Sequence, residues 1–253
     1  MTQAELAKYL LILAPFITPN EVDAASRTTG RAPTIPNEVA VDIQRWLQAP
    51  DSGVLWVEGP AYGPFDDSLA SIGARIQSSA EEVGISCVSF FAKTRYPFEA
   101  RLGSMKNAGL ISMTYSIISQ LIRIAPSSLP YTSDLAESKM RQLDGKLDTI
   151  STSLDVLKSL LSHLDPGLVV IICGFHLVDS RNNVAQLVRF VEILRDQAPE
   201  RRVKTLLVSS GNCMALAGSI DPSNRSDASR LTMARTHNVL PGGVAVNSIG
   251  LGR

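Results

Sequence analysis

Four short apolar runs alternate along the chain with longer segments in which apolar residues recur every three or four positions. Short continuous apolar runs are typical of buried strands, and the wider spacing is typical of amphipathic helices. Strands that alternate with helices predict a mainly parallel sheet covered on both faces. We therefore expect a three-layer α/β/α domain with strands at residues 54–58, 85–91, 168–173 and 203–209, and main helices at residues 37–49, 67–80, 108–124, 154–164 and 184–197.

The carboxyl ends of the predicted strands are the expected place for a ligand. In parallel α/β sheets the binding crevice lies outside these ends. A functional pocket in this protein should therefore be lined by Glu58–Gly59, Phe91–Ala92, Cys173–Gly174 and Ser209–Ser210.

The two ends of the chain differ in composition from the segment between them. Residues 1–35 contain one apolar helix candidate, 4–16, and then a polar stretch, which we interpret as a loosely packed arm and a linker. Residues 36–212 form the predicted domain. Residues 213–253 are small and polar, with one weak strand candidate at 243–247, and we expect this tail to be truncated or partly disordered.

The turn after the first predicted strand is rich in glycine and proline and leads directly into a helix. This is the layout of a phosphate-binding loop, in which backbone N–H groups and a helix N-terminus hold the anion. If Gly59 is the first glycine of the pattern G-x-x-x-x-G-K-[ST], the last three positions hold Pro64, Phe65 and Asp66. No lysine occurs between Gly59 and Lys93, so a small change of register does not restore the pattern.

Several segments in order resemble one protein family. Residues 43–59, which end in Leu-Trp-Val-Glu-Gly, resemble the lead-in to the P-loop of fungal NACHT-type NTPases, also called nephrocystin-like N-terminal domains. Residues 88–92 are similar to the second strand of that family and residues 117–122 to its next helix. Residues 169–177 resemble its Walker B strand, and residues 203–210 its sensor strand. The resemblance spans about residues 35–212 and implies a P-loop fold of the STAND type, nucleotide binding and a switch role in signalling or non-self recognition.

Transferred residue by residue, the resemblance implies a degenerate pocket. Phe65 stands at the Walker A lysine position and Asp66 at the hydroxyl position, with Gly63 and Pro64 before them and Asp67 after them. The Walker B acids of the family correspond to a segment that contains Cys173 and His176, and Asp179 lies further along. At the sensor strand Ser209 and Ser210 are followed by Gly211 and Asn212, so the arginine of the family is absent.

These replacements remove the charges that a nucleotide needs. A triphosphate is held by lysine, Mg²⁺ and oriented amides, and phosphoryl transfer depends on the same positioned charges. Two like unit charges about 4 Å apart repel by about 1 kcal/mol in water and about 4 kcal/mol at an effective dielectric constant near 20. A carboxylate beside phosphate, together with a missing lysine, should weaken binding by several orders of magnitude.

Composition argues against nucleic-acid binding, membrane insertion, secretion and a disulfide or zinc framework. Lys+Arg and Asp+Glu are both 24, so no net charge attracts nucleic acid or an anionic membrane. The apolar stretch at residues 9–16 is too short to cross a bilayer and is not a signal peptide, so we expect a cytoplasmic protein. Three cysteines are too few for a disulfide framework or a zinc site, and Cys173 with His176 supplies too few metal ligands.

The sequence thus predicts a non-catalytic module of the NACHT/STAND kind that acts in signalling through a protein partner. We expect no metal and no cofactor, or ATP or GTP with magnesium if the pocket is still competent. Two alternatives stay open at this point. One is a divergent NTPase that uses Lys93 or Asp179, and the other is an inactive remnant of a larger receptor.

Overall fold

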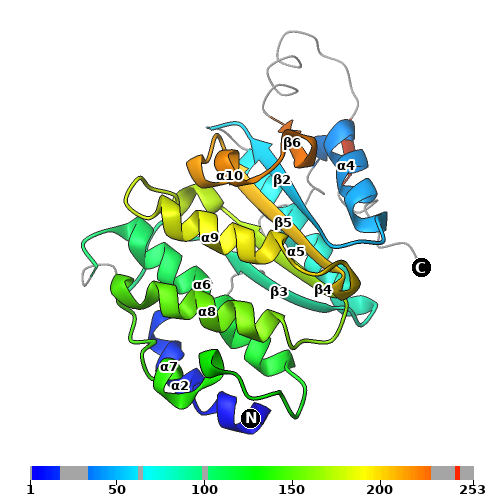
Figure 1. Ribbon diagram of the computed structural model, residues 1–253. Coiled ribbons are helices and arrows are strands. Elements are labelled where there is room, and N and C mark those ends of the chain that lie inside the picture. Colours follow the sequence, from blue (N-terminus) through cyan, green and yellow to red (C-terminus); the bar gives the residue numbers. More distant parts are fainter. Residues whose placement is uncertain (1, 18–33, 62–64, 99–101, 229–242, 246–253) are drawn as a thin grey trace.

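A computed structural model describes residues 2–17, 34–61, 65–98, 102–228 and 243–245. Its centre is a five-stranded sheet in which every strand is parallel to its neighbours, in the order β3-β4-β5-β2-β6 (Figure 1). The strands are β2 (Gly53–Gly59), β3 (Ser86–Phe91), β4 (Leu168–Cys173), β5 (Val203–Ser210) and β6 (Arg225–Asp227). The predicted three-layer α/β fold with a parallel sheet is confirmed.

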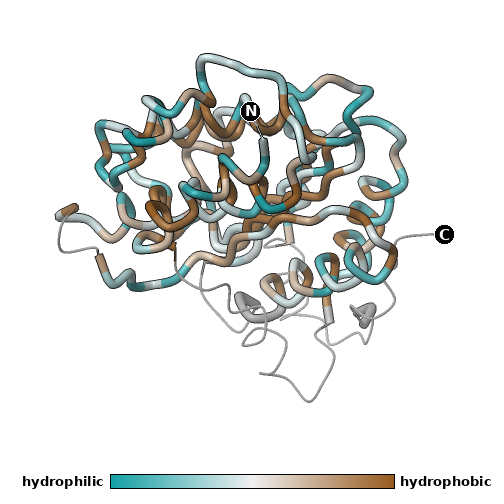
Figure 2. The backbone as a smooth tube through the Cα atoms, turned by 90° about the horizontal axis from the view of Figure 1, so that it is seen from below, coloured by the Kyte–Doolittle hydropathy of each residue, from teal (hydrophilic) through white to brown (hydrophobic). Residues whose placement is uncertain are grey.

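Helices cover both faces of the sheet because its strands are apolar on both faces. Residues such as Trp56 and Leu207 face a larger core, and residues such as Val57 and Leu206 face a smaller one. In Figure 2 the hydrophobic colour is concentrated in the strands and on the helix sides that face them. The larger core is covered by α6 (Met105–Ile124), α8 (Ile150–Leu161), α9 (Val184–Arg195) and α10 (Met214–Ser219), and the smaller by α4 (Asn37–Gln48) and α5 (Phe65–Glu82).

The connections reverse direction next to β2. From β2 the chain crosses by α5 to β3 at the far edge, and it then returns through β4 to β5 on the opposite face. Adjacent strands whose following helices lie on opposite faces form a topological switch point, where the crevice of an open α/β sheet lies. Here these strands are β2 and β5, so the switch point lies between the carboxyl ends of these two strands.

The N-terminal segment packs more firmly than the sequence predicted. It consists of α1 (Gln3–Ala7), α2 (Leu10–Leu13) and a 3₁₀ turn, η1 (Ala14–Phe16), instead of one continuous helix. Leu6 and Leu13 are fully buried in the larger core. Phe16 makes edge-to-face contacts with Phe98 and Tyr115, with ring centroids 5.5 and 5.7 Å apart. The prediction of a loose arm is therefore wrong for this segment, because its apolar side chains complete the core beside α6.

The start of the tail also belongs to the fold. Its apolar residues Cys213, Ala215, Leu216 and Ile220 lie in the larger core, and β6 adds a fifth strand beside β2. We predicted neither α10 nor β6, because β6 is only three polar residues long and carries no apolar pattern. The weak strand candidate near residue 243 is present as β7 (Gly243–Ala245), but it pairs antiparallel with β1 (Thr34–Pro36), outside the main sheet.

The segment between α6 and α8 is a connection made of short helical turns. It contains α7 (Glu137–Met140) and two 3₁₀ turns, η3 (Ser133–Leu135) and η4 (Leu147–Thr149). Three further 3₁₀ turns are η5 (Phe175–Leu177), η6 (Pro199–Arg201) and η7 (Pro222–Asn224). None of the helices in the described ranges combines the length and the hydropathy that a membrane crossing would need.

Candidate functional site

A cavity of about 230 Å³ lies at the carboxyl edge of the sheet. We call it the crevice. Its walls are the ends of β3, β4 and β5 and two residues of α5, Leu69 and Ala70. Three of the four strand ends that the sequence pointed to line it, and only Glu58–Gly59 does not. The lining residues are Leu69, Ala70, Phe91, Ala92, Thr94, Cys173, Gly174, His176, Leu177, Val208, Ser209 and Ser210.

The described lining of the crevice is uncharged. It contains no lysine, arginine, aspartate or glutamate, and its one titratable ring, His176, is engaged by the backbone. The N–H of Ser210 donates to Nδ1 of His176 at 3.0 Å, so this nitrogen carries no proton and the ring is held as the neutral tautomer. His176 therefore joins the turn after β4 to the end of β5.

Cys173 forms the floor of the crevice under α5. It is buried, and a Cβ on Gly73 of α5 would lie 2.5 Å from its Sγ. Glycine at position 73 thus lets the helix approach the end of β4 closely. Since the helix covers the thiol, the geometry favours a packing role for Cys173 over a role as nucleophile or metal ligand.

The ends of β2 and β5 are tied together beyond their last paired residues. The N–H of Gly211 donates to the carbonyl of Gly59 at 2.8 Å, and Gly211 has a φ of +75°, which glycine adopts without strain. Trp56 Nε1–H donates to the hydroxyl of Ser209 at 2.9 Å, and that hydroxyl donates to the Gly211 carbonyl at 3.0 Å. Ser209 and Ser210 at the end of β5 therefore both make structural hydrogen bonds.

The start of α5 agrees with the layout expected for a phosphate loop. β2 ends at Gly59 and α5 begins at Phe65, so the helix starts at the position where the Walker A lysine stands in the family. Asp66 and Asp67 follow in its first turn, whereas Gly63 and Pro64 lie outside the described residues. Leu69 of α5 occupies the space that a Cβ on Gly59 would need, so the helix lies directly against the end of β2.

The structure does not bring Asp179 to the crevice. Its Oδ2 accepts the N–H of Met214 at 2.6 Å and so caps the start of α10. The ammonium of Lys106 donates to the backbone carbonyl of Asp179 at 2.6 Å. The thiol of Cys213 lies beside this carboxylate, and burial together with the negative charge raises the pKa of the thiol. Asp179 is thus a structural residue that joins the loop after β4 to α10.

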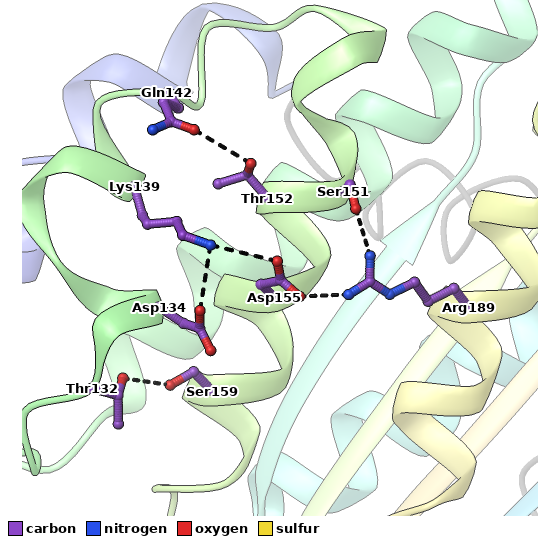
Figure 3. Close-up of polar contacts among 9 residues, drawn as sticks. All are labelled: Thr132, Asp134, Lys139, Gln142, Ser151, Thr152, Asp155, Ser159 and Arg189. Carbon is purple, nitrogen blue, oxygen red and sulfur yellow. Dashed lines mark hydrogen bonds and ion pairs between the residues drawn. The ribbon is translucent and has the colours of Figure 1, made fainter.

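A larger and more polar cavity, of about 560 Å³, lies between α8, α9 and the η3 turn. Sequence reasoning missed it, because its side chains come from segments that show only amphipathic spacing. Arg189 donates to Ser151 at 2.6 Å and pairs with Asp155 at 2.5 Å, while Lys139 reaches Asp155 at 3.7 Å and Asp134 at 3.5 Å (Figure 3). These charges are already paired with one another, so the contacts connect α7, α8 and α9 and offer little to a charged ligand.

No group of three histidine, cysteine, aspartate or glutamate side chains within the described residues is arranged to hold a metal ion. Lys93, the other residue considered for a divergent NTPase, does not line the crevice; its backbone N–H donates to the hydroxyl of Tyr96 at 3.1 Å. No model of a known protein family matches the sequence, and no curated protein matches it significantly.

Proposed function

We propose that this chain is a non-catalytic module with a P-loop-like fold, of the NACHT/STAND kind, and that it works as a binding or switch element in signalling and not as an NTPase. The main observation behind this proposal is the uncharged lining of the crevice in the described part of the chain. Hydrolysis of a nucleoside triphosphate requires cations on the phosphates and an acid or amide that orients water. Here the corresponding positions carry a buried thiol and a neutral imidazole.

Support for the P-loop part of the proposal comes from the layout of the first strand and helix. The glycine turn leaves the sheet at the switch point between β2 and β5, and α5 starts at the spacing that the pattern requires. The role in signalling and the protein partner rest on the family resemblance. The uncharged described lining of the crevice favours a role in binding over one in phosphoryl transfer.

The experiment is thermal unfolding with and without millimolar Mg-ATP or Mg-GTP, together with a phosphate-release assay. A ligand present at about one hundred times its Kd would add about 2.7 kcal/mol to the free energy of unfolding. For a domain of this size that corresponds to a rise in Tm of about 5–10 °C. We expect no such rise and no phosphate release above the buffer rate.

Two variants separate the proposal from a divergent NTPase. Asp179→Ala removes both the carboxylate and the cap on α10, whereas Asp179→Asn keeps an oxygen that can accept the N–H of Met214. Phosphate release by the wild type that is lost in both variants would overturn the non-catalytic proposal and assign a chemical role to Asp179.

A further inference from the structure

A third cavity, of about 320 Å³, lies at the amino-terminal edge of the sheet, at the opposite end of the strands from the crevice. We call it the edge pocket. It is enclosed by α4, by the start of β2, by the second residue of β5 and by η7 with the start of β6. The lining residues are Asp42, Arg45, Trp46, Ala49, Asp51, Ser52, Gly53, Val54, Leu55, Lys204, Ser223, Asn224 and Arg225.

Lys204 is the unusual member of this lining. It lies on β5 opposite Gly53 of β2 and Val169 of β4, and only 9% of its surface is exposed. In the part of the chain that the structure describes, no acceptor takes a hydrogen bond from its Nζ. A buried ammonium without an acceptor is costly, and natural proteins leave such groups unpartnered mainly where a ligand or water completes them.

Burial lowers the pKa of Lys204, and the charge of Asp51 opposes this effect. Asp51 also lines the pocket, yet its carboxylate accepts no hydrogen bond from the lysine. The amine therefore feels a negative charge nearby without being hydrogen-bonded to it.

The remaining charged groups of the edge pocket are already paired. Asp42 accepts from Arg45 at 3.0 Å and from the hydroxyl of Ser226 at 2.9 Å. The guanidinium of Arg225 pairs with Glu58 at 2.5 Å and lies 4.6 Å from the ring centre of Trp56, which belongs to the other face of the sheet. Lys204 and Asp51 are thus left as the charges available to a ligand, and Arg45 stands exposed at the rim with guanidinium N–H groups that Asp42 does not use.

We propose that the edge pocket binds a small oxyanion of low charge, best a carboxylate, whose oxygens accept from the ammonium of Lys204 and from the guanidinium of Arg45. The volume is at the lower end of the range for small-molecule sites, about 300–1,000 Å³. Charge-assisted hydrogen bonds from lysine and arginine are the usual means of holding such a group. Asp51 limits the charge of the bound anion, because its carboxylate would repel a dianion such as hydrogen phosphate more strongly than a monoanion.

The bound anion would also affect the fold locally. The pocket lies between α4 and the η7–β6 segment, so a ligand that contacts both walls stabilises the attachment of β6 to β2. This site does not depend on the proposed function, since it is separate from the crevice and shares no lining residue with it.

The test is binding of sodium acetate and of inorganic phosphate at pH 7, at constant ionic strength set with sodium chloride. Affinity is measured by titration of the Tm and by chemical-shift changes of backbone amides in residues 223–225. The proteins are the wild type, Lys204→Met, Lys204→Gln and Arg45→Met. Lys158→Met, which removes a lysine that lines the polar cavity between α8 and α9, is the matched control.

We expect acetate to bind the wild type and Lys158→Met equally. We expect binding at least tenfold weaker in both Lys204 variants and a smaller loss in Arg45→Met. If one Lys204 variant is poorly folded, the other still tests the site. The amide chemical shifts report binding at the pocket separately from the Tm. The proposal is overturned if neither anion binds beyond the effect of chloride, or if both Lys204 variants bind as the wild type does. Tighter binding of phosphate than of acetate would keep the oxyanion site and refute the preference for a carboxylate.

Discussion

The imidazole of His176 and the backbone of Ser210 are joined by a hydrogen bond of 3.0 Å that closes one side of the crevice. His176 belongs to the turn after β4, and Ser210 is the last residue of β5. In the NTPase family that the sequence resembles, the corresponding region would carry acids that bind the metal ion and polarise water. Here the side chain satisfies a backbone donor at the end of a strand, so we infer that it stabilises the edge of the sheet.

His176→Ala should therefore destabilise the protein. It removes the Nδ1 atom that accepts from the N–H of Ser210, and loss of this hydrogen bond costs about 1–2 kcal/mol of unfolding free energy. His176→Asn places an oxygen near the position of Nδ1 and should recover most of this loss. Denaturant unfolding gives the free energies, and hydrogen exchange at Ser210 gives a local check. Equal stability and equal exchange in all three proteins would contradict the structural role.

The central sheet could be predicted from the sequence because its strands are continuous apolar runs bounded by glycine and proline. The run at residues 168–173 defined β4 without error, and Gly59 marked the end of β2. β6 could not be predicted, because its three residues are held by the backbone of β2 and by one arginine, and neither contact leaves a periodic pattern. The positions of the crevice residues followed from strand ends, whereas the roles of Asp179 and of the edge pocket depend on contacts between distant segments.

The attachment of β6 depends on Arg225. Its guanidinium pairs with the buried Glu58 and stacks on Trp56, while its own side chain is about one third exposed. Replacement by methionine leaves the Glu58 carboxylate without this partner, and because solvent screens part of the pair, we expect a cost of about 2 kcal/mol. The double variant Glu58→Gln/Arg225→Met should be more stable than Arg225→Met alone. Additive losses in the double-mutant cycle, measured by chemical denaturation, would show that the two groups are not coupled.

Substitution by alanine should have opposite effects at two glycines. One, Gly73 of α5, is packed against β4, and the other, Gly218, lies in open space on α10. Alanine at Gly73 would bring its Cβ within 2.5 Å of Cys173 Sγ and 3.0 Å of a methyl group of Ile171, so we expect a loss of about 1–3 kcal/mol. Alanine at Gly218 in α10 meets no atom within 4 Å and should gain about 0.5–1 kcal/mol from helix propensity. The difference in Tm between the two variants measures the contrast. A neutral Gly73→Ala would mean that α5 can move away from β4 without cost.

Cys87 provides a pH-dependent prediction. Burial, aided by the charge of Glu81, raises the pKa of this thiol from 9.0 to about 12. At pH 8 the thiolate fraction in the folded protein is then about a thousandfold lower than in the unfolded chain, so alkylation by iodoacetamide should be slow until the protein unfolds. Because the folded pKa is the higher one, the stabilisation is complete below about pH 9 and is lost as the pH rises toward 12. Cys87→Ser should remove that part of the alkaline loss of stability, and rapid alkylation of native Cys87 at pH 8 would contradict the assignment.

The double substitution Phe65→Lys/Asp66→Ser tests whether the turn after β2 still has the geometry of a phosphate loop. α5 begins at residue 65, so the new lysine stands at the spacing that the pattern requires. A charge-assisted hydrogen bond from lysine contributes about 1.5–3 kcal/mol. Removal of the carboxylate at residue 66 relieves a repulsion of about 1–4 kcal/mol. Together these changes should tighten Mg-ATP binding by at least tenfold, measured as a rise in Tm, without phosphate release, because the described lining of the crevice carries no carboxylate that could orient water. Phe65→Gln/Asp66→Ser is the matched control, which relieves the repulsion without supplying a cation. If the lysine variant gains nothing over this control at millimolar nucleotide, the loop does not present its amides to phosphate, and the P-loop part of the proposal fails.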